Sequence, residues 1–455
     1  MHRIVLVSGV LAALCTLPRT GVAQDPAFPP RTELPSGDTL TLSLADAQRL
    51  ALERNPAFLA ERQEAEIARG GLRQARVYNF NPELAFEAPG ATTGIGMGEY
   101  EASLTQEIAW AGQRGLRIRA ARLGLDRAES GVRNAARQTL AEVSDAYYTA
   151  LTAQRRLAVT QEVAGLNQRL LDATRIQLRE GEISVLEANL AEIEVGRARA
   201  RVLTAEREAT SARLELQRLT GIGPDQVVRV DEKVPDVPPL STLDADSLVA
   251  LALVRRPDLA ARSRAVEQSR ALTSLARREA IPNLRIGVLV EREAIGATPG
   301  LAGPLETTAY ESPRIGLAVS LPVPLWNRNQ GLIAERQALA EQATLARQAT
   351  ELEVRTQVAD ALRAYRTATE EIRIFAEDVL EPARQNQDLL GTAYRAGKID
   401  LATLLLLRNQ LLDAEFGYWD AWLAERRALV ELQAATATLG SDILSSDTLE
   451  SSNDR

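Results

Sequence analysis

The side chains that most often carry chemistry in proteins are almost absent from this sequence. It contains a single Cys and a single His, Cys15 and His2, and both lie close to the N-terminus. The rest of the chain offers no thiolate or imidazole for a metal site, a disulfide, or a Cys/His or Ser/His catalytic arrangement. Paired carboxylates could still perform acid–base chemistry. We expect no resident metal and no cofactor.

Charged residues gather at two matching places along the chain. They flank Gly181 in Arg179-Glu180-Gly181-Glu182-Ile183 and Gly397 in Arg395-Ala396-Gly397-Lys398-Ile399. Glycine adopts the left-handed backbone conformation that ends a helix, so each motif predicts a turn between two helices. The alternative is plain helix termination with solvated charges. Elsewhere Arg alternates with Glu, and the formal net charge is −8, which gives no indication of nucleic-acid binding.

The first residues have the pattern of a secretory signal peptide. Arg3 provides a short basic region, an apolar stretch follows over 4–17, and Gly21-Val22-Ala23 supplies small residues for cleavage. An uncleaved anchor helix is one alternative, and lipidation of Cys15 is another, although the Leu before this Cys is larger than a lipoprotein signal requires. We expect the chain to be exported, with 1–23 removed.

The rest of the chain contains an internal repeat of roughly 200 residues, too long for a solenoid unit. Its landmarks recur in the same order: Asn81-Pro82-Glu83-Leu84 and Ile281-Pro282-Asn283-Leu284, Trp110 and Trp326, Gly181 and Gly397, Leu216-Gln217 and Leu432-Gln433. We therefore divide the chain into an N-terminal segment (24–42), a first repeat (43–223), a Pro-rich linker (224–243), a second repeat (244–440) and a flexible tail (441–455).

Each repeat predicts the same order of helices. A short helix (43–54, 244–255) ends before a proline, and a second helix follows (57–78, 257–280). After a β segment, the first repeat predicts a helix over 113–178, with apolar residues every three or four positions. At 1.5 Å per residue it would span roughly 100 Å, which suggests a coiled-coil-like stave. Its counterpart over 330–394 contains Pro382, which should kink it.

Four short segments alternate apolar and polar residues within two predicted hairpins, at about 82–109 and 283–324. The segments are 83–88, 99–110, 284–291 and 315–323. Strands with one apolar face fit a transmembrane β-barrel, but a soluble sheet lying on a helical core gives the same alternation. No helix contains an apolar run long enough to cross a bilayer.

A membrane role for these strands requires several copies of the chain. Four strands cannot close a barrel, for which roughly eight are needed, and lipid does not tolerate an open sheet edge. Trp110 and Trp326 stand where each hairpin returns to helix, which is where membrane-interface anchors would sit. Packing at a strand–helix corner is the alternative for both.

Signal peptide, repeat, hairpins and staves together resemble the TolC-type outer-membrane efflux family over essentially the whole mature chain. Three motifs look most like the CzcC/CusC-like branch that serves heavy-metal RND pumps: Phe80-Asn81-Pro82-Glu83-Leu84, the stretch from Gln106 to Arg114, and Leu321-Pro322-Val323-Pro324-Leu325-Trp326-Asn327-Arg328-Asn329-Gln330-Gly331. The resemblance implies a mainly α fold that is not an enzyme.

The resemblance also implies an assembly. Three chains would give a homotrimer whose β-barrel of about 12 strands lies in the lipid of a Gram-negative outer membrane. The long helical hairpins would form an α-barrel through the periplasm. Expected partners are a periplasmic adaptor (membrane fusion) protein and an inner-membrane RND transporter. The protein would be the passive exit duct, with divalent metal cations as substrates.

The family's periplasmic tips, where the adaptor docks, correspond to the two glycine turns. The implied docking residues are Arg179, Gly181, Glu182, Ile183, Ser184, Arg395, Gly397, Lys398 and Ile399. Candidates to line or gate the pore are Glu182, Glu187, Tyr394 and Asp400. Some relatives have an acidic constriction at positions held here by Thr403 and Leu406, so this departure puts a narrow acidic ring in doubt.

Other functions remain open on the sequence alone. The same duct could serve drug or solvent efflux or type I protein secretion, because a conduit without metal ligands fits those substrates equally well. A periplasmic coiled-coil scaffold or adaptor is a further alternative.

Overall fold

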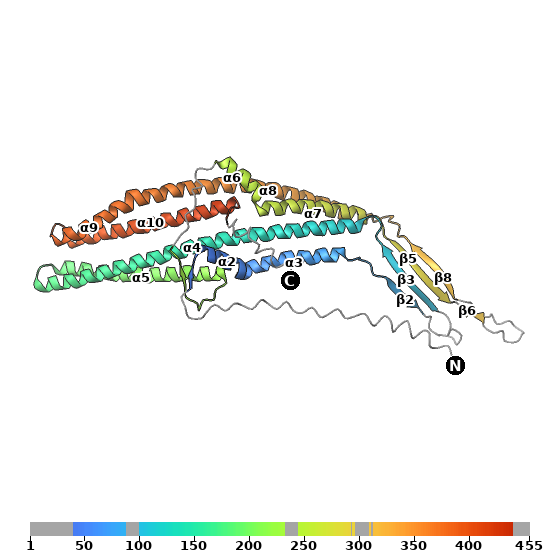
Figure 1. Cartoon of the computed structure of the whole chain (residues 1–455), viewed down its shortest axis with the longest axis horizontal. Coiled ribbons are helices and arrows are strands. Elements are labelled where there is room, and N and C mark those ends of the chain that lie inside the picture. Colours follow the sequence, from blue (N-terminus) through green and yellow to red (C-terminus); the bar gives the residue numbers. More distant parts are fainter. Residues whose placement is uncertain are drawn as a thin grey trace, which may run out of the picture.

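The structure is a computed structural model, and it describes residues 40–87, 100–232, 244–292, 294–295, 309–310 and 313–439. The predicted signal peptide with Cys15, the C-terminal tail, most of the linker and the loops of both hairpins lie outside these residues. The chain is elongated, with long helices at one end and a sheet at the other (Figure 1).

Two short helices open each repeat, as predicted. In the first repeat they are α2 (Leu44–Arg54) and α3 (Pro56–Arg76), and in the second α6 (Ala245–Arg255) and α7 (Pro257–Glu279). The Asn55 side chain caps α3 by accepting from the Ala57 amide at 2.9 Å, and Pro56 is the first helical residue. Arg256 holds the corresponding place before α7 without a side-chain cap.

The first long helix, α4 (Gln113–Glu180), has 68 residues and runs between left-handed glycines, Gly112 and Gly181. It pairs with α5 (Val185–Thr220). In the second repeat, α8 (Gln330–Ile374) passes into a π-helical segment, η2 (Phe375–Leu380), and then α9 (Glu381–Arg395), which pairs with α10 (Leu401–Ala435). Pro382 is in the first turn of α9, so the expected irregularity takes the form of the π-helical turns that precede it.

Two matching cores lie where the short helices pack on the long ones. Ala47 and Ala51 of α2 are buried with Leu140, Val143 and Tyr147 of α4. In the second repeat, α6 packs in the same way, and the buried members are Leu248, Ala252, Val358, Leu362 and Tyr365. A parallel pair of strands that the sequence did not reveal, β1 (Leu40–Leu42) and β4 (Val228–Val230), lies beside the first core.

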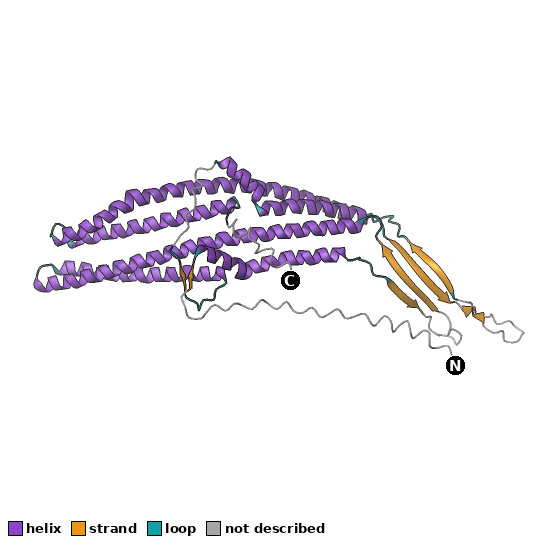
Figure 2. Cartoon of the chain, in the orientation of Figure 1, coloured by secondary structure: helices purple, strands orange, loops and turns teal. Residues whose placement is uncertain are grey.

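The four predicted strands form one antiparallel sheet beyond the helices (Figure 2). They are β2 (Glu83–Glu87), β3 (Tyr100–Ile108), β5 (Leu284–Arg292) and β8 (Arg314–Ser320), in the order β2-β3-β5-β8. The two strands of each repeat are adjacent, and β3 joins β5 across the repeats. A short pair, β6 (Ala294–Ile295) and β7 (Ala309–Tyr310), extends the second hairpin. Among the described residues the sheet extends beyond the ends of the helices and does not lie on a helical core, which was the alternative left open above.

Candidate functional site: the sheet and the hairpin tips

One face of the sheet is apolar across all four strands. Leu84, Leu104, Val288 and Leu317 are consecutive cross-strand partners, so their side chains point to the same side. Phe86, Ala102, Val290 and Ile315 form the next row. Most of these side chains are exposed, and Leu317 is 80% exposed. A contiguous exposed apolar face of this kind indicates a surface that meets lipid or another protein.

The opposite face is polar and charged. Glu87, Glu101, Glu291 and Arg314 are cross-strand partners in one row at the end of the sheet far from the helices. At the near end, Glu107 forms an ion pair with Arg285 at 3.6 Å and accepts a hydrogen bond from Asn283 at 2.7 Å. The sheet therefore has one apolar face and one polar face, as the alternation of apolar and polar residues along each strand predicts.

Polar side chains hold the corner between sheet and helices. The Gln113 side chain accepts from the Ala111 amide at 2.9 Å and donates to Arg278 and Ile281 carbonyls at 3.3 Å. Trp110 donates its indole N–H to the Pro282 carbonyl at 3.0 Å while most of its ring stays exposed. Trp326 is 86% exposed. Neither ring is packed in a core, and their role as interface anchors stays a prediction.

The first tip is a glycine turn followed by a capping box. Gly181 has φ of 77°, and the Glu182 amide donates to the Gln177 carbonyl at 2.9 Å, which closes the helix end. Ser184 then caps α5 together with Glu187: the Glu187 carboxylate accepts from the Ser184 amide at 2.8 Å. Glu187 is thus engaged in helix capping, and the sequence already shows the Ser-x-x-Glu signature for it.

The second tip repeats this geometry with different side chains. Gly397 has φ of 66°, and the Lys398 amide donates to the Ala393 carbonyl at 2.9 Å. Asp400 caps α10 by accepting from the Thr403 amide at 2.8 Å. The Thr403 side chain, and next this amide, lower the pKa of Asp400 by hydrogen bonding to its carboxylate. Thr403, the position where some relatives carry a carboxylate, is the residue that Asp400 caps.

The structure brings the two tips together. Leu171, Ala191 and Val195 of the first hairpin are buried against Leu401, Leu404 and Leu405 of α10. Tyr394 and Ile399 pack on the same cluster. Burial, and next the nearby Glu187 carboxylate, raise the pKa of Tyr394. Two of the four pore candidates therefore lie close enough to influence each other electrostatically.

The remaining tip residues are exposed. Arg179, Glu182, Ser184, Gly397, Lys398 and Asp400 all face solvent, and Ile183 and Ile399 are half-buried. The side chain of Arg395, the last residue of α9, lies outside the described part. No described side chain pairs with Arg179, Glu182 or Lys398, so these charges are available at the surface. Their roles in docking and gating stay predictions.

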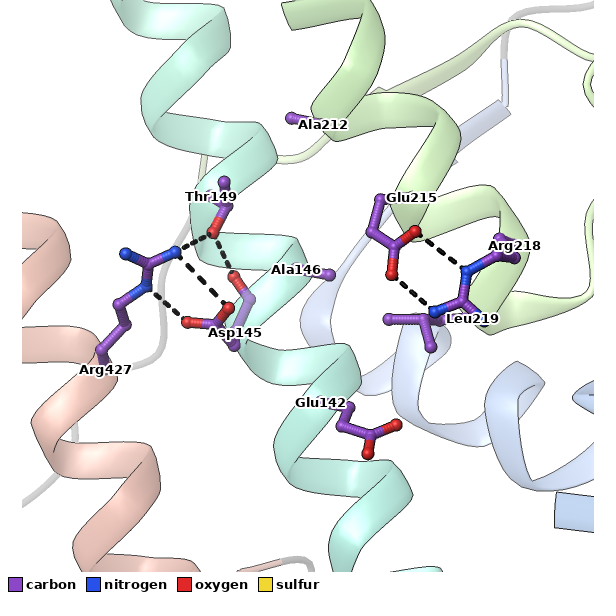
Figure 3. A pocket seen from close by; sticks show the side chains of 9 residues that line it. All are labelled: Glu142, Asp145, Ala146, Thr149, Ala212, Glu215, Arg218, Leu219 and Arg427. Atoms are coloured by element: carbon purple, nitrogen blue, oxygen red, sulfur yellow. Dashed lines mark hydrogen bonds and ion pairs between the residues drawn. The ribbon is translucent and has the colours of Figure 1, made fainter. Parts of the chain in front are cut away.

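Halfway along the helices, ion pairs join the two repeats. Arg427 of α10 donates to Asp145 at 2.5 Å and to the Thr149 hydroxyl at 3.0 Å, both on α4, at the edge of a cavity of about 260 Å³ (Figure 3). On the α5 side of this cavity, Glu215 and Arg218 form a two-pronged ion pair. No local sequence pattern predicts the contact between Asp145 and Arg427, because the two residues are so far apart along the chain.

Two other kinds of site are missing from the described ranges. His, Cys, Asp and Glu side chains there do not come together in groups of three or more that could hold a metal ion. None of the described helices combines the length and apolar character needed to cross a membrane.

An amphipathic four-stranded sheet continued by two long helical hairpins defines a class of outer-membrane channel protomers. Solved structures of CusC share this fold, with a TM-score of 0.68, 18% sequence identity, and coverage of 91% of this chain and 98% of CusC. The model of the outer membrane efflux protein family matches residues 48–222 and 248–438, one segment in each repeat. The chain belongs to this family, as the resemblance predicted, and is a channel-type protein rather than an enzyme.

Characterised relatives come from two kinds of system. The cobalt-zinc-cadmium resistance protein CzcC of Cupriavidus metallidurans is 23% identical over 399 residues, which cover 88% of this chain and 89% of CzcC. The alkaline protease secretion protein AprF of Pseudomonas aeruginosa is 24% identical over 429 residues, with 85% and 84% coverage. The likeness to CzcC agrees with the heavy-metal branch that the sequence motifs indicated.

Proposed function

We propose that this protein is the outer-membrane channel of a tripartite RND-type efflux system and serves as a passive exit duct for divalent metal cations. The observation that carries the proposal is the sheet. It has a continuous apolar face, a charged opposite face and two open edges, β2 and β8, so it can be stable in a membrane only when further copies complete it.

Three copies satisfy this requirement. They would join the β8 edge of one sheet to the β2 edge of the next and close a barrel of about 12 strands, above the roughly eight needed to enclose an interior. The apolar faces would meet lipid, the charged faces would line the lumen, and Trp110 and Trp326 would anchor the barrel at the membrane interface. The helical hairpins would continue the lumen through the periplasm.

The tips lie at the opposite end from the sheet, where a periplasmic adaptor and an inner-membrane transporter would meet the duct. Their exposed charges, Arg179, Glu182 and Lys398, together with Gly181 and Gly397, make up the proposed docking surface. Glu182, Glu187, Tyr394 and Asp400 are the proposed pore-lining or gating residues. The likeness to CzcC supports metal cations as substrates, and a lumen lined with carboxylates would favour cations.

Deletion and complementation test the proposal. We expect a deletion strain to become sensitive to zinc, cobalt or cadmium and to regain resistance when the gene is returned. The protein should be recovered in the outer-membrane fraction of the cells. After purification in detergent it should have the mass of a trimer. Sensitivity to hydrophobic antibiotics alone would overturn the metal assignment, and recovery as a soluble periplasmic monomer would overturn the channel.

A second candidate function is type I protein secretion, because AprF, which is named for protease secretion, matches the chain over a similar length. Under this alternative the deletion strain would keep its metal resistance and would lose one or more secreted proteins from the culture medium.

A further inference from the structure

The stretches that join the helices to the sheet are strongly basic. They are residues 70–82, 109–125, 268–283 and 321–334, and together they contain ten arginines and one acidic residue, Glu279. The chain as a whole has a formal net charge of −8. A basic zone therefore lies within an acidic protein, at the ends of α3, α4, α7 and α8 that point toward the sheet (Figure 1).

Six of these arginines lie at the helix ends themselves, and all six side chains are exposed. Two are in the last turn of α3 and two in the last turn of α7. One is the second residue of α4, and one precedes α8 by two residues. We call them the corner arginines: Arg73, Arg76, Arg114, Arg277, Arg278 and Arg328.

The corner arginines have no carboxylate partner among the described residues. Glu279, the single acid of the basic zone, pairs with Arg117 at 3.4 Å. Arg114 donates to the Arg76 carbonyl at 2.7 Å, which positions its guanidinium but leaves its charge uncompensated. Exposed guanidinium groups of one sign repel one another, so an anionic partner would stabilise this end of the helices.

Helix stability accounts for only part of this pattern. The corner arginines of α3 and α7 lie at C-terminal helix ends, where a cation interacts favourably with the helix dipole. Arg114 and Arg328 lie at the N-terminal ends of α4 and α8, where a cation is unfavourable. Neither of these helices has an acidic residue in its first turn or a side-chain cap. Positive charge is present there against the preference of the helix, which indicates a role in binding.

Exposed apolar side chains lie between the corner arginines and the apolar face of the sheet. Trp110 follows β3 and precedes α4, and Trp326 lies between β8 and α8. Both rings are exposed, and so are Val323 and Leu325 beside Trp326. From the sheet toward the helices, the surface therefore changes from apolar side chains to tryptophans and then to arginines. A phospholipid leaflet presents its acyl chains, interfacial region and phosphates in the same order.

We propose that the corner arginines bind the phosphate groups of anionic phospholipids in the leaflet that faces the periplasm. The inference rests on the proposed function, which places the sheet in the outer membrane with the helices on its periplasmic side. A guanidinium group binds two phosphate oxygens at once, and the long arginine side chain extends from a helix end into the headgroup layer. Because a zwitterionic headgroup neutralises its own phosphate, lipids with a net negative charge are preferred.

Lipid is a better partner for these charges than the lumen. A ring of arginines inside the duct would repel divalent cations and favour anions, which opposes the proposed transport. On the polar face of the sheet at this end, Glu107 pairs with Arg285, so that face already balances its charges. The lipid phosphates can instead approach every copy from outside.

Quenching of tryptophan fluorescence tests the inference on the full-length protein in lipid vesicles. Trp110 and Trp326 report on lipid at the corner, whereas Trp419 and Trp422 lie in the middle of α10 and supply an unquenched background. The vesicles contain brominated phosphatidylglycerol or brominated phosphatidylcholine, and the ratio of the two quenching curves gives the preference for anionic lipid. We expect a preference of about fivefold at low salt, the effect of roughly one arginine near a charged surface, and a smaller preference at high salt.

Removal of charge locates the site. Arg277→Gln/Arg278→Gln should lower the preference at least about twofold, and Arg277→Lys/Arg278→Lys should retain most of it, because the charges remain. The control Arg262→Gln/Arg264→Gln changes two exposed arginines of the same helix, roughly 22 Å further from the sheet, and should behave like the wild type. Arg73→Gln/Arg328→Gln repeats the test at two other connections. The mass in detergent shows that each variant assembles.

The outcomes separate this inference from the proposed function. Equal quenching of the wild type by both lipids would overturn the lipid site and leave the channel intact. Absence of quenching by either lipid would show that the corner does not meet a membrane, and would overturn the proposed function itself. An unchanged lipid preference in both pairs of glutamine variants would also overturn the lipid site, and a simultaneous change of ion selectivity in planar bilayers would place these arginines in the lumen.

Discussion

The charged residues at the tips have two different tasks. Glu187 and Asp400 cap α5 and α10, and their carboxylates are held by backbone amides at 2.8 Å. Arg179, Glu182 and Lys398 make no such contacts with the described residues and are free to meet a partner. Helix capping is worth roughly 1 kcal/mol, so a substitution at Glu187 or Asp400 alters the helix end as well as any pore charge. Substitutions at Arg179, Glu182 and Lys398 therefore test docking more directly.

The glycines of the tips give the first prediction. Both have φ near +70°. Proline cannot adopt this backbone conformation, because its ring fixes φ near −65°. We expect Gly181→Pro and Gly397→Pro to leave oligomers of normal mass and to abolish efflux, because the turns would no longer present the docking charges. Resistance assays and detergent mass measurements check this. Gly181→Ala serves as a milder control and should cost about 1 kcal/mol locally; normal resistance in both proline variants would remove the tips from the proposed function.

Glu425 of α10 gives a prediction on pH. Its side chain is buried beside Arg426 and near Tyr148, and burial raises its pKa above the ordinary value of 4.5 although Arg426 opposes the change. Between the ordinary pKa and the raised one, the folded protein holds a proton that the unfolded chain has lost. The free energy of unfolding therefore falls as the pH rises from the ordinary pKa of 4.5 through the raised pKa of the folded protein.

We therefore expect Glu425→Gln to melt at a higher temperature than the wild type at pH 7.5, with a gain of about 1 kcal/mol, because the amide carries no buried charge. The difference should vanish near about pH 4, where both states of the wild type are protonated. Thermal melts in detergent at the two pH values measure it, and a variant that is less stable at pH 7.5 would show that the ion pair with Arg426 outweighs burial.

At the scale of elements, regular patterns were predictable and long-range contacts were not. The helices and the four strands follow from periodicity, prolines and glycines, and their ends agree with the structure within a few residues. Strands β1 and β4 were missed because three-residue strands carry no periodic signal. Phe375, the first residue of the π-helical turns before Pro382, packs so closely on Gly417 that an added Cβ there would lie 2.5 Å from its ring. The sequence does not reveal such a contact.

The candidate site divides in the same way. The apolar face of the sheet and the glycine turns could be read from local sequence. The burial of Tyr394 near Glu187 and the pairing of Asp145 with Arg427 could not, because each joins residues of different repeats. Which charges at the tips are unpaired depends on which side chains cap the helices. The Ser184-x-x-Glu187 pattern predicts one of these caps, at the start of α5.

The sheet offers a test in which neighbouring residues should behave in opposite ways. Leu317 points to the apolar face and Ala318 to the polar face. If the apolar face meets lipid, Leu317→Arg should cost roughly 2–4 kcal/mol near the middle of the membrane and reduce the amount of assembled protein. Ala318→Arg is the matched control and should assemble normally. Quantification of heat-resistant oligomer in outer-membrane fractions distinguishes them, and equal tolerance of both would argue against lipid contact.

The row of Glu87, Glu101 and Glu291 gives a prediction on selectivity. Like charges directly opposite one another destabilise a sheet, so a lumen that attracts cations would compensate for them. We expect Glu101→Gln to lower the preference for cations over anions, measured as a shift of the reversal potential in planar bilayers with a salt gradient. The control is Glu83→Gln, which lies in a row with no other charge. An unchanged reversal potential in Glu101→Gln would mean that this row does not set selectivity.

At the scale of the whole molecule, duplication explains why a single chain looks incomplete. Within the chain α4 of the first repeat packs on α10, whereas the corresponding side of α8, its counterpart in the second repeat, is exposed among the described residues. The same residue type can therefore be buried in one repeat and exposed in the other. Arg137 and Arg355 are such a pair, because Ala146-Tyr147 of α4 aligns with Ala364-Tyr365 of α8 and places the two arginines at corresponding positions.

This pair tests how much the contact with α10 stabilises one repeat relative to the other. Arg137 is buried and donates to the Ala434 carbonyl at the end of α10, so Arg137→Met should remove this charge-assisted hydrogen bond and destabilise each protomer by about 1–3 kcal/mol. Arg355 is exposed, and among the described residues it pairs with Glu351 of its own helix, a contact that is worth little. Arg355→Met should therefore leave protomer melting almost unchanged. Unfolding midpoints of the two variants in detergent measure the difference, and a loss of protomer stability in Arg355→Met equal to that in Arg137→Met would contradict this difference between the repeats.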